Sequence, residues 1–261
     1  MRRLMEYKII SGPVVEIRRS WLPVRGTQEA KPRGTRRAGA STEKKIRANE
    51  KSSQRELARL INCNFGTGDA FLTLKYDPDH YPASFTVEAA QEDLKKCLRK
   101  ARAAYLKRTG KKLKAIWVTA NWSPHRQAPA RIHHHLVVPG DAMQLLRELW
   151  QGGGMSAEFL DNRGDHSDLA AYLQANVHDR PGKKHWSSSR GMEQPQYTEP
   201  EEVTEIEDVQ PEEGSVIKEH ETNCDEEGRV TSAYLRCLLP EPPKVRGGQI
   251  VLPRRRRRKR G

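Results

Sequence analysis

The chain is poor in several residue types that would otherwise narrow its class. Only four cysteines occur among 261 residues and none forms a C-x-x-C pair, which argues against a zinc ribbon and favours reduced thiols. No run of 18 apolar residues is present, so the sequence excludes a membrane-spanning helix. The first 25 residues lack the apolar core of a signal peptide. These absences together predict a cytoplasmic protein.

Hydrophobic residues are also scarce, at 35% of the chain. Globular domains carry about 45–50% when glycine is counted, so we expect part of this chain to lack a packed core. The formal net charge is +13 and the pI is near 9.7. Such a balance favours a polyanionic partner such as nucleic acid, and a solvated basic surface is the alternative.

The N-terminal region is strongly basic. Its first 60 residues contain 16 Lys or Arg and 6 acidic residues, and Gly26–Ala40 has the composition of a mobile basic loop. A basic segment of this kind often follows phosphates, although it can also be a solvated charged face. We therefore expect a basic N-terminal arm over residues 1–54.

The composition of the C-terminal region changes twice along the chain. Glu199–Glu227 holds 13 acidic residues and a single lysine, Val230–Leu239 regains strand character, and Arg254–Arg260 is an unbroken basic run. Low hydrophobicity and high charge are typical of disorder. We therefore expect an acidic linker and basic C-terminal tail, largely disordered, over residues 196–261.

Between these ends, apolar periodicity predicts an ordered domain over residues 55–195. The expected strands cover residues 69–76, 113–119, 132–138 and 155–160, and the expected helices cover residues 43–60, 86–107, 142–150 and 168–177. This order suits an α+β fold, with helices packed on one face of an antiparallel sheet. The two middle strands should pair as neighbours.

The third of these strands carries the most informative residues, in the segment R-I-H-H-H-L-V-V over residues 131–138. Side chains alternate between the faces of a strand, so His133 and His135 share one face and His134 occupies the other. Two imidazoles on one face can hold a divalent metal ion. The alternative is that the three histidines are simply polar residues at a strand end.

Three segments, in this order, resemble the motifs of the HUH-type rolling-circle replication initiators, the Rep proteins of bacterial plasmids, phages and integrative elements. They are F-L-T-L-K-Y at 71–76, R-I-H-H-H-L-V-V at 131–138 and D-L-A-A-Y-L at 168–173. The resemblance covers about residues 55–195. It implies the RRM-like HUH endonuclease fold, in a protein that acts on DNA in the bacterial cytoplasm.

The resemblance also implies a reaction and its residues. His133 and His135 would bind Mn²⁺ or Mg²⁺, and Tyr172 would attack a phosphodiester to leave a 5′-phosphotyrosine link that the same site can later rejoin. Expected DNA contacts are Thr73, Lys75, Arg131, Lys183 and Lys184. The partners would be single-stranded or origin DNA and a host helicase and polymerase, because the chain has no G-x-x-x-x-G-K-[ST] loop.

The sequence departs from the family pattern near the nucleophile. His134 occupies a position that is usually apolar. The family often has a lysine three residues after the tyrosine, but this chain has Ala175. Spacing of i, i+3 would place such a lysine beside the tyrosine on a helix. Arg180, Lys183 or Lys184 are the residues that could substitute.

A second departure concerns the third metal ligand. Relatives often supply an acidic or amide side chain from the neighbouring strand, where this chain has Ala120, with Asn121 or His125 as alternatives. These differences leave two other hypotheses open. One is a non-catalytic DNA-binding replication-control protein, and the other is a related HUH transposase or relaxase.

The remaining aromatic residues have simpler interpretations. Tyr76 ends its strand and could line the site, whereas Tyr105 fits the apolar stripe of a helix. Trp122 and Trp186 could stack on unpaired bases, and Trp117 is expected in the core.

Overall fold

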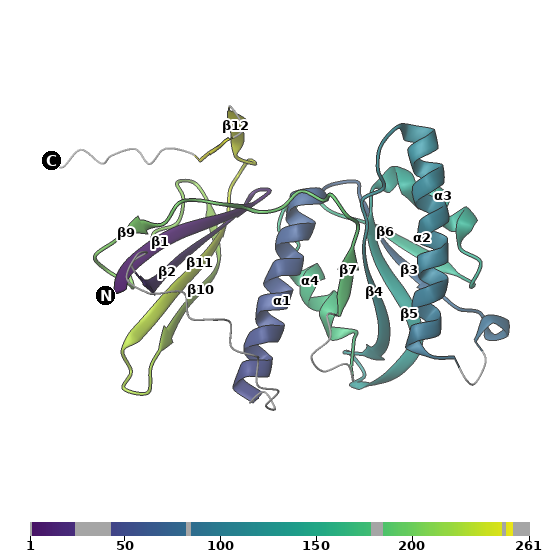
Figure 1. Ribbon diagram of the computed structural model, residues 1–261, viewed down its shortest axis with the longest axis horizontal. Helices are drawn as coiled ribbons and strands as arrows, with labels where there is room; N and C mark the ends of the chain where they lie inside the picture. The colour runs from purple at the N-terminus through teal and green to yellow at the C-terminus, as the bar shows by residue number, and fades with distance from the viewer. Residues whose placement is uncertain (1, 24–42, 82–84, 179–184, 247–248, 253–261) are drawn as a thin grey trace, which may run out of the picture. The chain divides into compact units, whose positions relative to one another are not determined.

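The computed structural model describes residues 2–23, 43–81, 85–178, 185–246 and 249–252. The chain divides into two compact units, which we call the histidine unit (Lys51–Glu193) and the flanking unit (Met1–Glu50 with Gln194–Gly261). Figure 1 colours both by residue number. The expected basic loop at Gly26–Ala40 and the basic run at Arg254–Arg260 lie outside the described residues.

The histidine unit is built on a five-stranded sheet, which we call the histidine sheet, with order β6-β3-β5-β4-β7. Its strands are β3 (Ala70–Lys75), β4 (Ile116–Ser123), β5 (Ala128–Val138), β6 (Met155–Phe159) and β7 (Trp186–Ser188). Every pairing is antiparallel, and β4 and β5 are neighbours as predicted. The α+β class with an antiparallel sheet is therefore confirmed.

Helices cover both faces of this sheet rather than one. They are α1 (Glu43–Asn64), α2 (Val87–Thr109), α3 (Met143–Leu149) and α4 (Ser167–Ala175), with 3-10 turns η1 (Pro78–His80) and η2 (Gly140–Ala142). α2 and α3 lie on one side of the strands, and α1 and α4 lie on the other (Figure 1). The expectation of helices on a single face was wrong.

The reason is that both faces of the histidine sheet are apolar over much of their length. Leu72, Leu74 and Leu136 point to the α2 side and are fully buried there. Val118 and Val137 point to the opposite side, where side chains of α1 and α4 pack against them. Each Å² of apolar surface left in water would cost about 25 cal/mol of folding free energy, so helices must cover both faces.

The termini of α2 follow the chemistry of the sequence. The Thr86 side chain accepts a hydrogen bond from the Ala89 backbone N–H at 3.2 Å, which satisfies one of the free donors of the first turn. Gly110 ends the helix with φ of 71°, a left-handed conformation that favours glycine. The predicted start and end of this helix are thus confirmed.

The flanking unit contains a second antiparallel sheet, with order β10-β11-β2-β1-β8 and with β9 also paired to β1. Its strands are β1 (Arg2–Ser11), β2 (Val14–Pro23), β8 (Gln196–Tyr197), β9 (Glu201–Glu202), β10 (Val216–Cys224) and β11 (Val230–Leu238), and a separate hairpin pairs β12 (Lys244–Arg246) with β13 (Gln249–Val251). Residues 2–23 are therefore not a basic arm. The expectation of a largely disordered C-terminal region is also wrong for residues 196–238.

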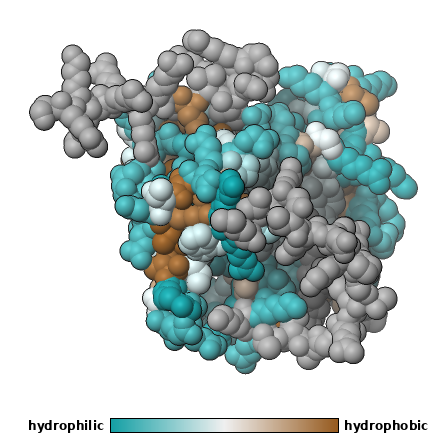
Figure 2. Space-filling model, turned by 60° about the vertical axis from the view of Figure 1, so that its left-hand side comes forward, coloured by the Kyte–Doolittle hydropathy of each residue, from teal (hydrophilic) through white to brown (hydrophobic). Residues whose placement is uncertain are grey.

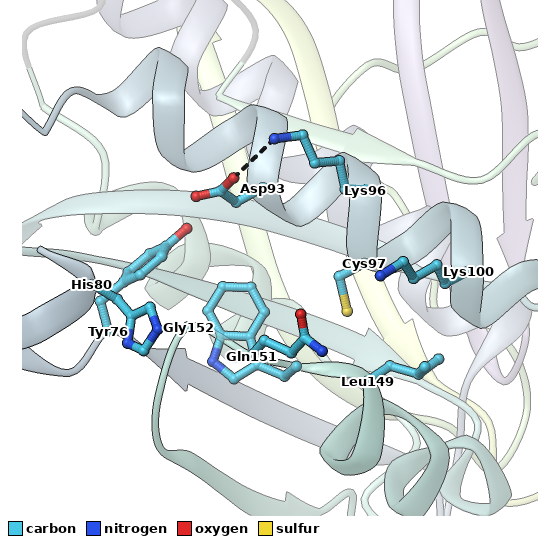
Figure 3. A pocket seen from close by; sticks show the side chains of 10 residues that line it. Tyr76, His80, Asp93, Lys96, Cys97, Lys100, Leu149, Gln151 and Gly152 are labelled. Carbon is cyan, nitrogen blue, oxygen red and sulfur yellow. Dashed lines mark hydrogen bonds and ion pairs between the residues drawn. The ribbon is translucent and has the colours of Figure 1, made fainter.

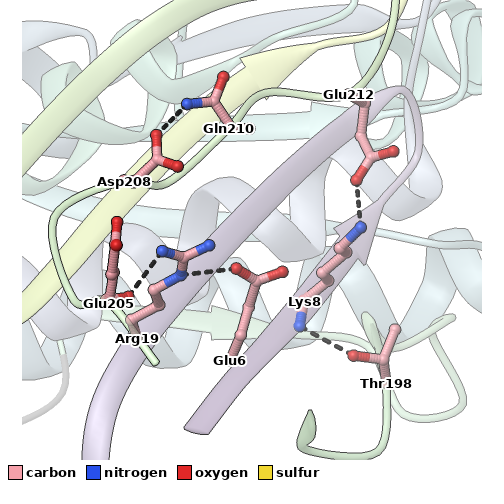
Figure 4. A network of polar contacts seen from close by, with 8 residues as sticks. All are labelled: Glu6, Lys8, Arg19, Thr198, Glu205, Asp208, Gln210 and Glu212. Carbon is pink, nitrogen blue, oxygen red and sulfur yellow. Dashed lines mark hydrogen bonds and ion pairs between the residues drawn. The ribbon is translucent and has the colours of Figure 1, made fainter. Parts of the chain in front are cut away.

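Charge explains why these two polar regions are ordered (Figure 4). Lys8 on β1 forms an ion pair with the buried Glu212. Arg19 on β2 forms an ion pair with Glu6 at 2.7 Å and donates to the backbone carbonyl of Glu205 at 2.8 Å. The basic N-terminal strands and the acidic segment neutralise each other, so the charge that predicted disorder in the acidic segment alone stabilises the sheet that the two regions form.

A small apolar core completes the flanking unit. Val15 and Ile17 on β2 pack with Leu235 and Cys237 on β11, and all four are buried.

The face seen in Figure 2 is mainly hydrophilic among the described residues, with hydrophobic side chains gathered in narrow strips. Among the described helices, none is long and apolar enough to cross a membrane.

Candidate metal and nucleophile site

The register of the histidine sheet places the two expected metal ligands beside polar residues of β3. His135 lies opposite Thr73, and His133 lies opposite Lys75. Directly opposed residues of an antiparallel pair project to the same face of the sheet. The four side chains therefore share one face, which we call the histidine face, and His134 projects to the other.

The two imidazoles converge. Their Nε2 atoms are 3.0 Å apart, and each Nδ1 atom has its own partner. Nδ1 of His133 lies 2.8 Å from the carbonyl oxygen of Arg131, and Nδ1 of His135 lies 3.1 Å from Oγ1 of Thr73. Partners of this kind on the far ring nitrogen orient histidines that ligate metals.

These partners determine the protonation of each ring. A carbonyl oxygen only accepts, so Nδ1 of His133 carries the proton and its Nε2 presents a lone pair. The Thr73 hydroxyl can either donate or accept, so the proton of His135 can sit on either nitrogen. On Nε2 it bonds to His133, and on Nδ1 it bonds to Thr73 and leaves a second lone pair facing the first.

Burial keeps both rings neutral. It is the main cause that lowers the pKa of His133, with the charge of Lys75 acting in the same direction. Burial and the neighbouring His133 lower the pKa of His135 to about 3, and a hydrogen bond with the Asn176 side chain partly offsets this. Neutral imidazoles are the form that binds cations, so the pair is ready to bind at neutral pH.

The structure brings Tyr172 to this pair. α4 is anchored by Ala170 and Leu173, which are fully buried against the histidine face. The Tyr172 ring packs against the ring of His135, with centroids 5.3 Å apart and planes at 61°. Tyr172 remains 44% exposed, so a large substrate can approach it.

Two residues of the site were missed from the sequence. Phe71 stacks on His135 with centroids 5.2 Å apart and presents its ring to the edge of Tyr172 at 6.1 Å. Asn176 is buried and its amide donates to the Tyr172 carbonyl at 2.6 Å while also bonding to His135. The i, i+4 spacing from Tyr172 could have indicated Asn176, because residues at that spacing are neighbours on a helix.

The chain after α4 is tied to the end of β4. The Asn176 carbonyl accepts from the backbone N–H groups of Asn121 and Trp122, both at 3.1 Å. The Asn121 side chain donates to the carbonyl of His178 and accepts from its N–H. The Trp122 and His178 rings stack at 4.2 Å. These contacts hold the C-terminal end of α4, and hence Tyr172, in one position.

The three residues considered as a third metal ligand lie in different surroundings. Ala120, which stands where relatives often have a third ligand, lies opposite His133 and has no side-chain atom that could ligate a metal. Asn121 uses its amide on His178. His125 lies in the turn between β4 and β5. Across the residues that the structure describes, no group of three His, Cys, Asp or Glu side chains could hold a metal. Asn176 is the amide residue that interacts with His135.

The expected DNA contacts are only partly described. Lys75 is exposed on the histidine face next to His133. Arg131 lies over the Tyr81 ring at 4.6 Å. The Thr73 hydroxyl is engaged with His135, and its contact with DNA stays a prediction. Lys183 and Lys184 lie outside the described residues, as does Arg180.

Among the aromatic residues, Trp186 cannot stack on bases, because it is 3% exposed and packs in the core with its indole N–H on Ser53. Tyr105 is buried in the core as predicted. Tyr76 lies on the α2 side instead of lining the histidine face, with its hydroxyl 2.9 Å from Nε2 of His134. Nδ1 of His134 lies 3.1 Å from Oγ1 of Thr119, so a buried polar chain satisfies this histidine.

No family model, curated protein or solved structure matches this chain.

Proposed function

We propose that the histidine unit is an HUH-type endonuclease that nicks and rejoins a single DNA strand, with the RRM-like fold of that family. The observation that carries the proposal is the contact of the Tyr172 ring with His135, whose Nε2 atom faces that of His133 at 3.0 Å. A lone tyrosine on a helix is usually a packing residue. An exposed tyrosine beside two converging neutral imidazoles has the composition of a phosphodiester-cleaving site.

The two histidines fit a divalent cation. Ligand atoms about 2.1 Å from an octahedral ion, at right angles to each other, are about 3.0 Å apart, which is the separation of the two Nε2 atoms. His133 and His135 would hold Mn²⁺ or Mg²⁺, with the Asn176 amide as a candidate third ligand. When bound, the ion withdraws charge from the non-bridging oxygens of a phosphate.

The protein's own side chains supply the rest of the reaction. The Tyr172 hydroxyl gives up its proton to solvent and its oxygen attacks phosphorus, so that a P–O bond to tyrosine forms and the bond from phosphorus to the 3′ oxygen breaks. The 3′ oxygen takes up a proton from solvent and leaves as a 3′-hydroxyl. The product is a 5′-phosphotyrosine. Lys75, exposed beside His133, attracts the phosphate. Because the phosphotyrosine keeps the energy of the broken ester, a 3′-hydroxyl can reverse the step and join the strands.

The test is a cleavage assay on single-stranded oligonucleotides tiled over the DNA that encodes the chain, with Mn²⁺. Wild type should form a denaturation-resistant protein–DNA adduct. Tyr172→Phe should form less than about one thousandth as much, and His135→Ala should also lose it. Tyr197→Phe is the matched control, because Tyr197 is an exposed tyrosine of the flanking unit. An adduct that persists in Tyr172→Phe would place the nucleophile elsewhere.

A non-catalytic DNA-binding protein is the second candidate. It is favoured by Ala175, which stands where the family often has lysine, and by the missing third His, Cys, Asp or Glu ligand in the described part of the chain. Wild type that binds the oligonucleotides but forms no adduct in the same assay would support it. Adducts on the ends of a mobile element, in preference to an origin, would indicate a transposase or relaxase.

A further inference from the structure

The charge of the histidine unit is concentrated in one continuous stretch. Residues 94–140 contain 12 Lys or Arg and no Asp or Glu. The stretch covers most of α2, the loop after it, β4 and β5. At the start of this stretch, Lys95 and Lys96 form ion pairs with Glu92 and Asp93 on the preceding turn of α2.

A groove of about 730 Å³ opens where this stretch passes from α2 into β4. We call it the lysine groove. Its cationic lining consists of Lys111, Lys112, Lys114 and Arg190, and the rest consists of Thr67, Gly68, Asp69, Tyr105, Leu113, Pro139, Gly140, Asp141 and Gly191. The groove lies at the end of the histidine sheet where β5 finishes and β3 begins.

The two carboxylates of the groove are used within the fold. Asp69 accepts hydrogen bonds from the backbone N–H groups of Gly66 at 2.9 Å and Gly140 at 3.3 Å. Asp141 accepts from the Tyr105 hydroxyl at 2.8 Å. Their charges reduce the positive potential of the groove, but neither carboxylate is paired with one of its cations.

Most of the cationic side chains in the lysine groove are available to bind an anion. Lys114 forms an ion pair with Glu193 at 2.8 Å. Lys111, Lys112 and Arg190 are exposed, and their side chains form no ion pair with any residue that the structure describes. Three neighbouring cations without a counterion repel one another, so a bound polyanion would relieve that repulsion.

One wall of the groove is tightly packed backbone. A Cβ atom added to Gly140 would lie 2.0 Å from the carbonyl oxygen of Gly68, so only glycine allows these two segments to meet. The cations thus stand around a rigid edge. The lining combines cationic side chains and backbone with apolar atoms such as those of Leu113 and Pro139, which suits the phosphates and the sugar rings of a nucleic-acid strand.

We propose that the lysine groove binds the sugar–phosphate backbone of the DNA strand that continues from the nicking site. The proposal rests on the function proposed above. His133 and Val138 are five residues apart on β5, or about 17 Å at 3.4 Å per residue, and Pro139 and Gly140 then line the groove. At 3.4 Å per nucleotide of a stacked strand, at least about five nucleotides span that distance.

The experiment measures the affinity of Lys111→Ala/Lys112→Ala for labelled oligonucleotides by fluorescence anisotropy, in EDTA so that no cleavage occurs. We expect affinity at least about fivefold below wild type, and a salt dependence reduced by about 1.4 in the slope of log K against log salt for two lost phosphate contacts. The loss should appear only with oligonucleotides that extend at least about five nucleotides to one side of the nick. Lys111→Arg/Lys112→Arg should bind like wild type.

Lys95→Ala/Lys96→Ala is the matched control, because it removes the same charge from lysines that are already paired. Figure 3 shows the ion pair of Lys96 with Asp93, beside a separate cavity of about 290 Å³. An equal loss in the control, or a loss independent of oligonucleotide length, would overturn the proposal. Competition by polyglutamate as effective as that by DNA would also overturn it in favour of an acidic peptide.

These outcomes are separate from those of the proposed function. Wild type without a covalent adduct, but with length-dependent loss in Lys111→Ala/Lys112→Ala, would reject the nuclease and keep the groove. Normal adduct formation with unchanged affinity in that variant would reject the groove and keep the nuclease.

Discussion

The histidine unit and the flanking unit are both built on antiparallel sheets, but they differ in how their strands are specified. In the histidine unit, most elements carry their own periodic apolar pattern, and fully buried leucines such as Leu72 and Leu136 lie on the strands that the pattern predicts. In the flanking unit, β1 and β2 pair with segments about 190 to 220 residues away in the chain, and ion pairs such as Lys8–Glu212 connect them. Local patterns predicted most strands of the first sheet, whereas in the second they indicated only the segment of β11 and gave no sign that β1 and β2 pair with the C-terminal strands.

The strongest way to sharpen this comparison is to create a cavity in each core. Leu72→Ala should cost about 2–5 kcal/mol of unfolding free energy in the histidine unit, and Ile17→Ala should cost a similar amount in the flanking unit. Both side chains are fully buried. Hydrogen exchange read by mass spectrometry should show lost protection confined to the mutated unit. Loss that spreads through both units in both variants would mean that they unfold as one.

The next test concerns the ion pairs that connect the strands of the flanking unit. Glu212→Ala should destabilise the flanking unit by about 3 kcal/mol, because it leaves Lys8 without its partner in a site where Glu212 is 3% and Lys8 25% exposed. Glu202→Ala breaks the exposed pair with Arg3 and should cost less than about 1 kcal/mol. Urea denaturation of both variants measures the difference. Equal costs would show that the acidic segment is held by strand pairing alone.

The third prediction concerns the site, which lies within the histidine unit alone. Thr73→Val removes the hydroxyl that accepts from Nδ1 of His135 when its Nε2 is free to ligate, so Mn²⁺ affinity should fall about 10- to 100-fold. Thr73→Ser should restore it. Mn²⁺ titration by electron paramagnetic resonance gives the affinity, and the cleavage assay should follow it. Unchanged affinity in Thr73→Val would remove Thr73 from the site.

The smallest effect is a difference in acid sensitivity. Burial lowers the pKa of His166, whose Nε2 has no hydrogen-bond partner among the described residues. The unfolded chain binds a proton near pH 6.5 and the folded chain does so only at lower pH, so this contribution to stability is complete above about pH 6.5 and is lost as pH falls below it. His166→Leu should reduce that loss, by less than about 1.4 kcal/mol for each pH unit. Thermal unfolding from pH 7 to 5 measures it, and an unaltered pH profile would contradict it.

Much of the histidine unit could be predicted because its signals are local. The helix expected over residues 86–107 is α2, which Thr86 and Gly110 cap, and alternation predicted β3 and β5. The prediction that His133 and His135 share one face followed from the alternation of side chains along a strand. Helix spacing could have placed Asn176 beside Tyr172, but the contacts of Asn176 with His135 and of Phe71 with Tyr172 depend on where α4 lies against the sheet.

The sequence by itself determined the helices and four of the five strands of the histidine unit, and which two histidines share a face, because these depend on neighbours a few positions apart. Only the tertiary structure decided that helices cover both faces, that Tyr172 lies against His135, and that the basic N-terminal and acidic C-terminal regions form one sheet. These features depend on contacts between residues far apart in the chain, whose free energy no local pattern records.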